Sequence, residues 1–266
     1  TRGGRLLVTN TQVSGQRGVS VPAALVTGSS RGIGAATAVR FARDGYDVTV
    51  NYHSSAEAAA DTAAAVREAG REATVVEADA SDPEGARRLV DRTVESFGSL
   101  DHLVNNAGID QHVYTAELSL EDFDRVMDVN VNSAFCCTKA ALSQLETADG
   151  GNAPTPSVTN ISSILDFTGA PDEVHYASSK GGLLSLTKSH AADFAPDVRV
   201  NAIAPGHVET DMTADRTPEE KREELAAIPV DRYGQPEDIA DAVAYLRDAG
   251  FVTGETLNVN GGELMR

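Results

Sequence analysis

Three side chains suited to acid–base chemistry lie within 18 residues of the chain, between Ser163 and Lys180. Tyr176 and Lys180 are four residues apart in a segment with helical periodicity, so we expect their side chains on one face of a helix, one turn apart. Ser163 follows a β-rich run, residues 157–161, and should lie at the carboxyl end of a strand, where open α/β sheets bind ligands. The spacing therefore predicts a trio that polarises and protonates a carbonyl group. The alternative is a surface tyrosine and a solvated lysine on an ordinary helix.

A glycine-rich turn connects the first predicted strand, residues 23–27, to a predicted helix, residues 35–44. Its glycines, Gly28, Gly32 and Gly34, follow the spacing G-x3-G-x-G. Residues without a Cβ let the backbone approach a pyrophosphate closely, and the pyrophosphate then lies at the amino end of the helix. The turn therefore predicts a dinucleotide site, although glycines of this kind also serve as plain turn residues.

Short β-branched runs alternate with alanine-rich helical segments from Val21 onward, a pattern typical of βαβ units and a parallel sheet. Residues 1–21 are rich in Gly, Ser, Thr and Gln and are interpreted as a flexible tail. A chain of 266 residues without an internal repeat or linker then predicts one α/β domain over residues 22–266. Strands are predicted at residues 23–27, 47–52, 73–77, 100–104, 157–161, 198–203 and 256–259, and the longest helix at residues 119–146.

The net charge of −18, from 40 acidic residues against 22 Lys and Arg, argues against nucleic acid and anionic membranes as partners. No apolar run approaches the length of a membrane span. The acid excess favours adaptation to a salt-rich cytoplasm, and a compositional bias with an ordinary acidic pI is the alternative. The two cysteines, Cys136 and Cys137, are adjacent, and no Cys/His metal spacing occurs. We therefore expect a reducing, cytoplasmic setting and no bound metal.

Several motifs occur together in a fixed order. They are TGSSRGIG from Thr27, NNAG from Asn105, DVNVN from Asp128, YASSK from Tyr176, and Ala204-Pro205-Gly206. In this combination the chain resembles the short-chain dehydrogenase/reductase family over nearly its whole length from Val21, and is most similar to the 3-oxoacyl-(acyl-carrier-protein) reductase-like subgroup. The resemblance implies a single-domain, Rossmann-type, doubly wound sheet of seven parallel strands with helices on both faces. It also implies a homotetramer.

The resemblance implies catalytic roles for the trio. Tyr176 would be the general acid/base, and Lys180 would bring the phenol's pKa toward neutrality and also hold the nicotinamide ribose. Ser163 would hydrogen-bond the substrate oxygen as negative charge develops on it, with Ser162 as the competing choice. The cofactor would deliver the hydride.

A fourth catalytic residue, Asn130, would hold a proton-relay water in a kink of the long helix, and Asn132 is the fallback. The resemblance also implies a nicotinamide dinucleotide site, in which Asp79 has the alternative role of capping the following turn. The residues matched to that site are Gly28, Ser30, Arg31, Gly32, Ile33, Gly34, Tyr52, His53, Asp79, Ala80, Asn106, Ala107, Gly108, Tyr176, Lys180, Pro205, Gly206, Val208 and Thr210.

The end of the second predicted strand bears on the choice of cofactor. An acidic residue there would accept hydrogen bonds from the 2′-hydroxyl of NAD and repel a 2′-phosphate. This chain has Asn51-Tyr52-His53-Ser54 at that place, and Arg31 lies inside the glycine turn. The sequence therefore predicts NADP(H), and NAD(H) remains an alternative because no second fixed cation is evident.

These features predict an NADP(H)-dependent oxidoreductase that acts on a small-molecule carbonyl or secondary alcohol, as a β-ketoacyl or small-ketone reductase. In family members that take acyl-carrier-protein thioesters, basic residues meet the acidic carrier, whereas residues 146–157 and 193–197 contain no Lys or Arg here. A sugar or polyol dehydrogenase is an alternative, and a non-catalytic cofactor-binding protein on the same fold is another. The substrate pocket is expected from residues 164–174, residues 110–114 and a lid over residues 212–233.

Overall fold

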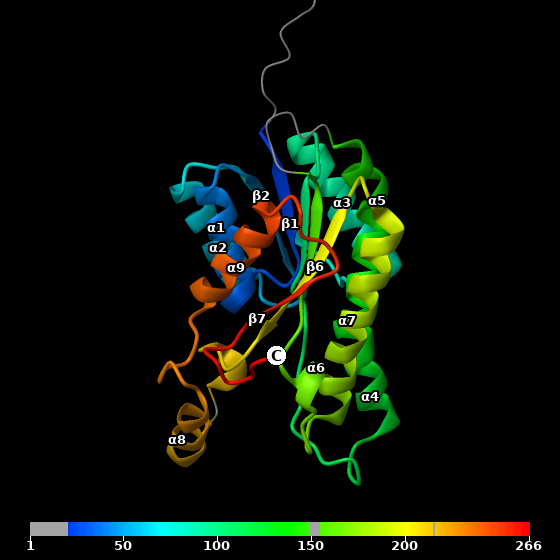
Figure 1. Ribbon diagram of the computed structural model, residues 1–266. Coiled ribbons are helices and arrows are strands. Elements are labelled where there is room, and N and C mark those ends of the chain that lie inside the picture. The colour runs from blue at the N-terminus through cyan, green and yellow to red at the C-terminus, as the bar shows by residue number, and fades with distance from the viewer. Residues whose placement is uncertain (1–20, 149–154, 215) are drawn as a thin grey trace, which may run out of the picture.

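The computed structural model describes residues 21–148, 155–214 and 216–266 (Figure 1). The N-terminal segment interpreted above as a flexible tail lies, up to residue 20, outside the described residues. All the strands belong to one parallel sheet in the order β3-β2-β1-β4-β5-β6-β7. The strands are β1 (Ala23–Val26), β2 (Asp47–Tyr52), β3 (Ala73–Glu77), β4 (His102–Asn105), β5 (Ser157–Ile161), β6 (Arg199–Pro205) and β7 (Thr256–Val259). The predicted seven-stranded parallel sheet is therefore confirmed.

Helices cover both faces of the sheet (Figure 1). One face carries α1 (Gly32–Arg43), α2 (Ala56–Glu68) and α9 (Pro236–Asp248), and the other carries α3 (Pro83–Phe97), α5 (Ser133–Thr147) and α7 (Val174–Phe194). Each helical layer packs its own apolar cluster against the strands, one around Phe41 and Ile239 and the other around Leu89 and Leu103. The central strands β1, β4, β5 and β6 are buried along their whole length. Strand β1 is accordingly apolar throughout, whereas the other three also carry buried polar residues.

The remaining helices lie beyond the carboxyl ends of the strands (Figure 1). They are α4 (Leu120–Met127), α6 (Leu165–Thr168), α8 (Pro218–Ala227) and the 3₁₀ turn Asp211–Thr213. The chain order reverses between β1 and β4, so a crevice for ligands is expected at this end of the sheet. In the described part of the chain, every helix is too short or too polar to cross a bilayer.

Local signals in the sequence set several helix boundaries. Asp82 caps α3, because its carboxylate accepts a hydrogen bond of 2.9 Å from the Gly85 amide, and Pro83 occupies the first turn. The long predicted helix is interrupted, since a π-helical turn over Asp128–Asn132 separates α4 from α5. The short helix α6 was not predicted, because four residues carry too little periodicity to be recognised.

Candidate active site

The glycine turn forms a tight loop between β1 and α1. Gly28 has a φ of +60°, and a Cβ at this position would lie 2.9 Å from Ala107 Cα, so the loop passes directly against the segment after β4. Helix α1 begins at Arg31 without a side-chain cap and has no acidic residue in its first turn. Its first amide groups therefore remain available for an anion, which fits the pyrophosphate of a dinucleotide.

The segment after β4 holds this loop in place. The Asn106 side-chain amide donates to the carbonyls of Thr27 (2.9 Å) and Gly28 (3.0 Å), and the Thr27 hydroxyl accepts from the amides of Asn106 and Ala107 (both 3.0 Å). Asn106 was matched to the dinucleotide site, and its NH₂ group is occupied by the loop. Its observed contacts are therefore structural.

A matched pair of glycine variants tests how closely the loop is packed. A Cβ at Gly34 would lie 2.5 Å from Asn106 Nδ2 and 2.6 Å from the Gly28 carbonyl oxygen. We expect Gly34→Ala to displace the loop, to lower the stability by about 1–3 kcal/mol and to raise the KM for the cofactor. Differential scanning calorimetry and cofactor titration measure both effects. Gly250→Ala is the control, because nothing lies within 4 Å of its Cβ position, and equal melting temperatures for the two variants would contradict this packing.

Tyr176, Lys180 and Ser163 come together at the carboxyl end of β5. Lys180 is 4% exposed, and its Nζ donates to the Ile161 carbonyl (2.8 Å) and lies 5.3 Å from the centre of the Tyr176 ring. Ser163 follows β5, and its hydroxyl lies close enough to Tyr176 to lower the pKa of that phenol. The predicted spacing therefore brings these three side chains to one place.

Asn130 lies in the π-helical turn, where the backbone widens and turns its side chain inward. It is 1% exposed, and its Oδ1 accepts from the Ile109 amide (2.8 Å) while its Nδ2 donates to the Ile109 carbonyl (3.0 Å) and to the Ser179 hydroxyl (2.9 Å). Gly108 lies against it, since a Cβ there would be 3.3 Å from Asn130 Oδ1 and 3.5 Å from Lys180 Nζ. Asn130 therefore ties the loop after β4 to α7.

The competing residues point elsewhere. The Ser162 hydroxyl is buried and donates to Asp166 Oδ2 (2.8 Å) and to the Lys180 carbonyl (3.0 Å), away from the tyrosine. Asn132 is exposed and donates to Asp128 Oδ1 at 2.6 Å. Of the two candidate serines, Ser163 therefore faces Tyr176 and Lys180. Of the two candidate asparagines, Asn130 does.

The electrostatics of the site differ from the expectation. Burial raises the pKa of Tyr176 above its ordinary value, and the carboxylates of Asp110 and Glu173 raise it further, while the Ser163 hydroxyl lowers it. Burial lowers the pKa of Lys180 to about 8, although Asp110 and Asp166 oppose this change. In the chain by itself, burial and nearby acids therefore raise the pKa of Tyr176, and the lowering of that pKa by Lys180 stays a prediction.

The outer part of the predicted cofactor site lies at the ends of β2 and β3. The Tyr52 hydroxyl donates to Glu77 Oε2 (3.1 Å), and His53 is exposed beside it. Asp79 Oδ1 accepts from the amide (2.9 Å) and hydroxyl (2.7 Å) of Ser81, and these bonds lower the pKa of Asp79 although burial opposes them. Asp79 therefore caps the following turn, as its alternative assignment predicts. Ala80, directly after it, is buried.

The inner part of the predicted cofactor site is closed by the segment after β6. Pro205 ends that strand, and its carbonyl accepts from the Ile164 amide at 3.0 Å. Val208 is buried, and the Thr210 methyl lies 3.5 Å from the Cβ position of Gly32. The Pro205–Thr210 segment thus contacts the glycine turn. This contact joins the inner and outer parts of the predicted cofactor site. Arg31, Ser30 and Ile33 complete the turn itself, with Arg31 exposed and Ile33 packed on the core.

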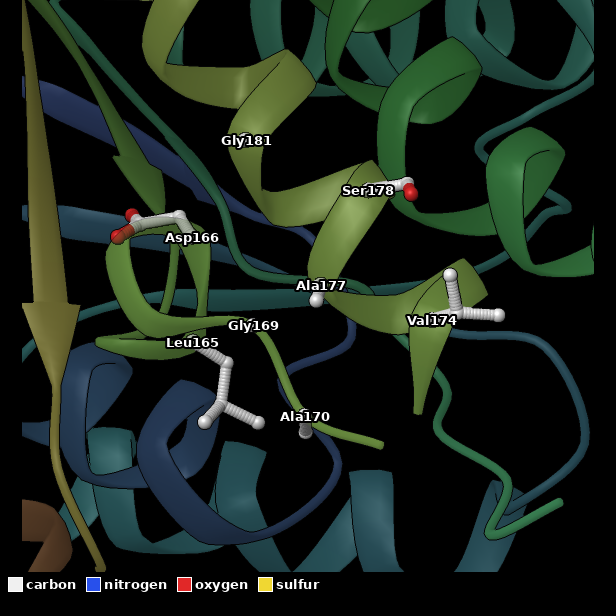
Figure 2. A pocket seen from close by; sticks show the side chains of 8 residues that line it. All are labelled: Leu165, Asp166, Gly169, Ala170, Val174, Ala177, Ser178 and Gly181. Carbon is white, nitrogen blue, oxygen red and sulfur yellow. The ribbon is translucent and has the colours of Figure 1, made fainter. Parts of the chain in front are cut away.

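A groove of about 360 Å³ separates α6 from α7 (Figure 2). Figure 2 labels the residues that line it, namely Leu165, Asp166, Gly169, Ala170, Val174, Ala177, Ser178 and Gly181. Around the axis of α7, Lys180 is rotated only about 40° from Tyr176. The groove residues Ala177, Ser178 and Gly181 are rotated about 100–200° from it. The groove therefore runs along a different face of α7 from Tyr176 and Lys180.

Sequence reasoning missed two functional features. Asn51, a buried polar residue near the end of β2, accepts from the Gly28 amide (3.0 Å) and donates to the carbonyls of Val76 and Ala78, so it fixes the glycine turn to the sheet edge. Its polarity within a buried strand was the available signal. The sequence also predicted that residues 110–114, 164–174 and 212–233 line the substrate pocket, but it did not indicate that charged side chains of these segments meet around Glu173 as one cluster.

Known proteins are similar to this chain along most of its length. The sequence matches the family described as enoyl-(acyl carrier protein) reductase over residues 28–263. It is 43% identical over 244 residues to glucose 1-dehydrogenase 2 of Bacillus subtilis (strain 168), covering 90% of this chain and 93% of that protein. It is 38% identical over 245 residues to the 3-oxoacyl-[acyl-carrier-protein] reductase FabG of Staphylococcus aureus (strain Mu50), covering 91% of this chain and 98% of that protein.

A solved structure agrees with these relatives. The fold matches that of a short chain dehydrogenase from Burkholderia cenocepacia J2315 in complex with NADP, with a TM-score of 0.83, 35% identity and coverage of 90% of this chain and 96% of that one. The motif resemblance is confirmed by these matches, and the chain belongs to the short-chain dehydrogenase/reductase family of oxidoreductases.

Proposed function

We propose that this protein is an NADP(H)-dependent oxidoreductase that interconverts a carbonyl and a secondary alcohol on a small molecule. The observation that carries the proposal is the convergence of Ser163, Tyr176 and Lys180 beside a glycine turn whose helix is uncapped. When bound, the nicotinamide cofactor supplies or accepts the hydride. Initial rates with a carbonyl panel and NADPH test the proposal, and absence of turnover across the panel would refute it.

Each catalytic side chain then has a defined task. Tyr176 donates a proton to the substrate oxygen from its hydroxyl, which its raised pKa keeps protonated at neutral pH. The Ser163 hydroxyl donates a hydrogen bond to the same oxygen as negative charge develops. Lys180 stabilises the phenolate that Tyr176 becomes, and Asn130 positions the loop at Ile109 and the hydroxyl of Ser179.

NADP(H) is the proposed cofactor. The uncapped first turn of α1 would hold the pyrophosphate, and Lys180 would hold the nicotinamide ribose. Arg31 would receive the 2′-phosphate: its side chain is exposed at the turn and pairs with Asp211 at 3.3 Å, an exchangeable partner because both side chains are solvated. The NADP bound to the Burkholderia cenocepacia relative supports this choice.

Arg31→Ala tests the cofactor assignment. We expect wild-type kcat/KM to be higher with NADPH than with NADH, and the ratio to fall about tenfold in the variant, because a guanidinium–phosphate pair is lost. Arg43→Ala, an exposed arginine at the other end of α1, is the control and should keep the ratio. Asp211→Asn should keep or raise the NADPH-to-NADH ratio of kcat/KM, because it removes the carboxylate charge that competes with the 2′-phosphate for Arg31. A wild-type preference for NADH would contradict the assignment.

A small neutral carbonyl compound is the proposed substrate class. The likeness to the FabG reductase favours a β-ketoacyl or small-ketone substrate. Residues 193–197 (DFAPD) carry negative charge, which is unsuited to an acidic acyl carrier protein. The second candidate is a sugar or polyol, which the likeness to a glucose 1-dehydrogenase favours.

We also propose a homotetrameric, salt-adapted, cytoplasmic enzyme. Exposed Phe135 on α5 stacks with His190 of α7, and this apolar patch supports packing of α5 and α7 against a second copy. The net charge of −18 supports activity that rises with salt, and the two free thiols support a reducing setting. Molecular mass and activity measured in solution at low and high salt test the first two proposals.

A further inference from the structure

Charged side chains from three separate segments meet beside Tyr176. Asp110 and His112 lie in the loop after β4, Glu173 immediately precedes α7, and Arg216 comes from the segment before α8. One donor atom from each of Asp110, His112 and Glu173 lies within 4.8 Å of the others. His112 Nδ1 is 3.1 Å from Glu173 Oε1, and Arg216 is 3.3 Å from His112 and 4.0 Å from Glu173. We call Asp110 and Glu173 the carboxylate pair.

The carboxylate pair faces the reacting groups. Glu173 is three residues before Tyr176, and Asp110 is two residues after Gly108, whose Cβ position lies 3.5 Å from Lys180 Nζ. Both carboxylates raise the pKa of Tyr176, so their charges act on its hydroxyl. Each side chain of the pair is only 9% exposed. Substrate at the Tyr176 hydroxyl therefore lies next to two nearly buried carboxylates.

The hydrogen-bonding capacity of the pair is incompletely used. Asp110 Oδ1 accepts from the Gln111 amide (2.7 Å), but its Oδ2 is 3.7 Å from His112 Nε2, beyond hydrogen-bonding distance. Glu173 Oε1 has His112 as its near partner, and Arg216 is engaged chiefly with Glu224 at 3.1 Å. An ionised carboxylate accepts several hydrogen bonds, and burial raises the pKa of Glu173 to about 7, so a bound molecule that supplies donors is favoured here above this pH.

We propose that Asp110 and Glu173 accept hydrogen bonds from hydroxyl groups that flank the reacting carbon, and that the substrate is a neutral polyhydroxylated molecule, a monosaccharide or polyol. The inference rests on the proposed function and narrows its substrate class. Hydroxyls supply the donors that the pair lacks, whereas a substrate carboxylate or phosphate adjacent to the reacting carbon is repelled. A simple ketone or alcohol would leave these buried acceptor oxygens unpaired, which makes its binding free energy less favourable. The pair therefore selects against molecules without neighbouring hydroxyl groups.

A divalent cation is the competing occupant of the same residues. The Arg216 guanidinium lies 3.3 Å from His112 Nε2, and its positive charge would repel a cation bound among these residues. The arrangement therefore favours hydroxyl donors over a metal. Dialysis against EDTA should leave activity unchanged, and a loss that Zn²⁺ or Mg²⁺ reverses would overturn the proposal.

The main experiment compares substrates in wild type. NADP⁺-linked oxidation is measured with glucose, galactose, xylose and ribitol, with cyclohexanol as a ring alcohol lacking neighbouring hydroxyls, and with glucuronate as an anionic sugar. We expect kcat/KM for the best neutral sugar or polyol to exceed that for cyclohexanol at least 100-fold and to exceed that for glucuronate. Turnover of cyclohexanol or simple ketones without turnover of any neutral sugar or polyol overturns this inference alone. Absence of turnover with every alcohol and carbonyl overturns the proposed function as well.

Variants of the carboxylate pair test whether Asp110 and Glu173 cause the preference for polyols over cyclohexanol. Asp110→Asn and Glu173→Gln should each lower the polyol-to-cyclohexanol ratio of kcat/KM at least tenfold, mainly through KM for the polyol. Asp172→Asn is the matched control: it also contacts His112 (3.4 Å) but is not among the charges that chiefly shift the pKa of Tyr176, and it should change the ratio less than threefold. An unchanged ratio in both Asp110→Asn and Glu173→Gln would overturn the proposal, with circular dichroism verifying that the variants are folded.

Discussion

Replacing Tyr176 by phenylalanine is expected to lower kcat for carbonyl reduction by about 10²–10⁴-fold, the usual contribution of a positioned acid. The substitution removes one hydroxyl and keeps the ring, so the ring stays beside Lys180 and the fold should be unchanged. The raised pKa of Tyr176 means that the hydroxyl holds its proton in the free protein, and the variant has no group of the same reach to replace it. Steady-state rates with NADPH and the best ketone measure the loss.

Two controls separate chemistry from binding and folding. NADPH affinity, followed by the quenching of its fluorescence or by calorimetry, should change less than threefold, because the first turn of α1 is untouched. Tyr245→Phe removes a hydroxyl from an exposed tyrosine on α9 and should be as active as wild type. If Tyr176→Phe reduces ketones as fast as wild type, the proposed acid is wrong.

Replacing Lys180 by methionine is expected to reduce kcat/KM for carbonyl reduction by a comparable factor, about 10²–10³-fold at pH 7. Its Nζ lies 5.3 Å from the Tyr176 ring centre, and its positive charge stabilises the phenolate left when the proton is transferred. Methionine fills similar volume without a charge, and it leaves the Ile161 carbonyl without this donor. A small fall in melting temperature should therefore accompany the kinetic loss.

The pH dependence of the reaction rate tests whether Lys180 is the group that titrates. Burial lowers the pKa of Lys180 to about 8, so the side chain is charged below this pH and loses its charge as the pH rises through it. Wild-type kcat/KM for reduction should therefore fall above about pH 8, and the methionine variant should lack this limb. Lys188→Met, an exposed lysine on the same helix, should behave as wild type. A variant at Lys180 that keeps the alkaline fall would show that another group is responsible.

The carboxylate pair also affects the chemistry that these variants probe. Asp110 raises the pKa of both Tyr176 and Lys180, so its charge holds the proton on the phenol and keeps the lysine cationic to higher pH. When a polyhydroxylated substrate hydrogen-bonds to Asp110, it would change the influence of this carboxylate on the pKa of Tyr176 and on the pKa of Lys180. Substrate recognition and acid–base chemistry are therefore coupled in this site, which is a reason to measure pH profiles with both a polyol and a simple alcohol.

The sequence alone determined the features that depend on local spacing. The period of the apolar runs predicted the parallel strands, and the strands at residues 47–52, 73–77, 157–161 and 256–259 have the predicted bounds. The four-residue interval between Tyr176 and Lys180 placed both on one helix face, because helical geometry fixes that relation without reference to the rest of the chain. The glycine spacing likewise predicted the turn before α1.

Only the tertiary structure decided what surrounds the reactive trio. Asp110, Glu173 and Arg216 are brought together by loops at the carboxyl ends of different strands, and no periodicity relates positions so far apart in the chain. The direction of the Tyr176 pKa shift follows from this convergence: the sequence showed a nearby lysine and predicted a decrease, whereas burial and the carboxylates of Asp110 and Glu173 produce an increase. The proposed substrate recognition depends on the same loops, because long-range packing, and not local spacing, sets which charges lie around Tyr176.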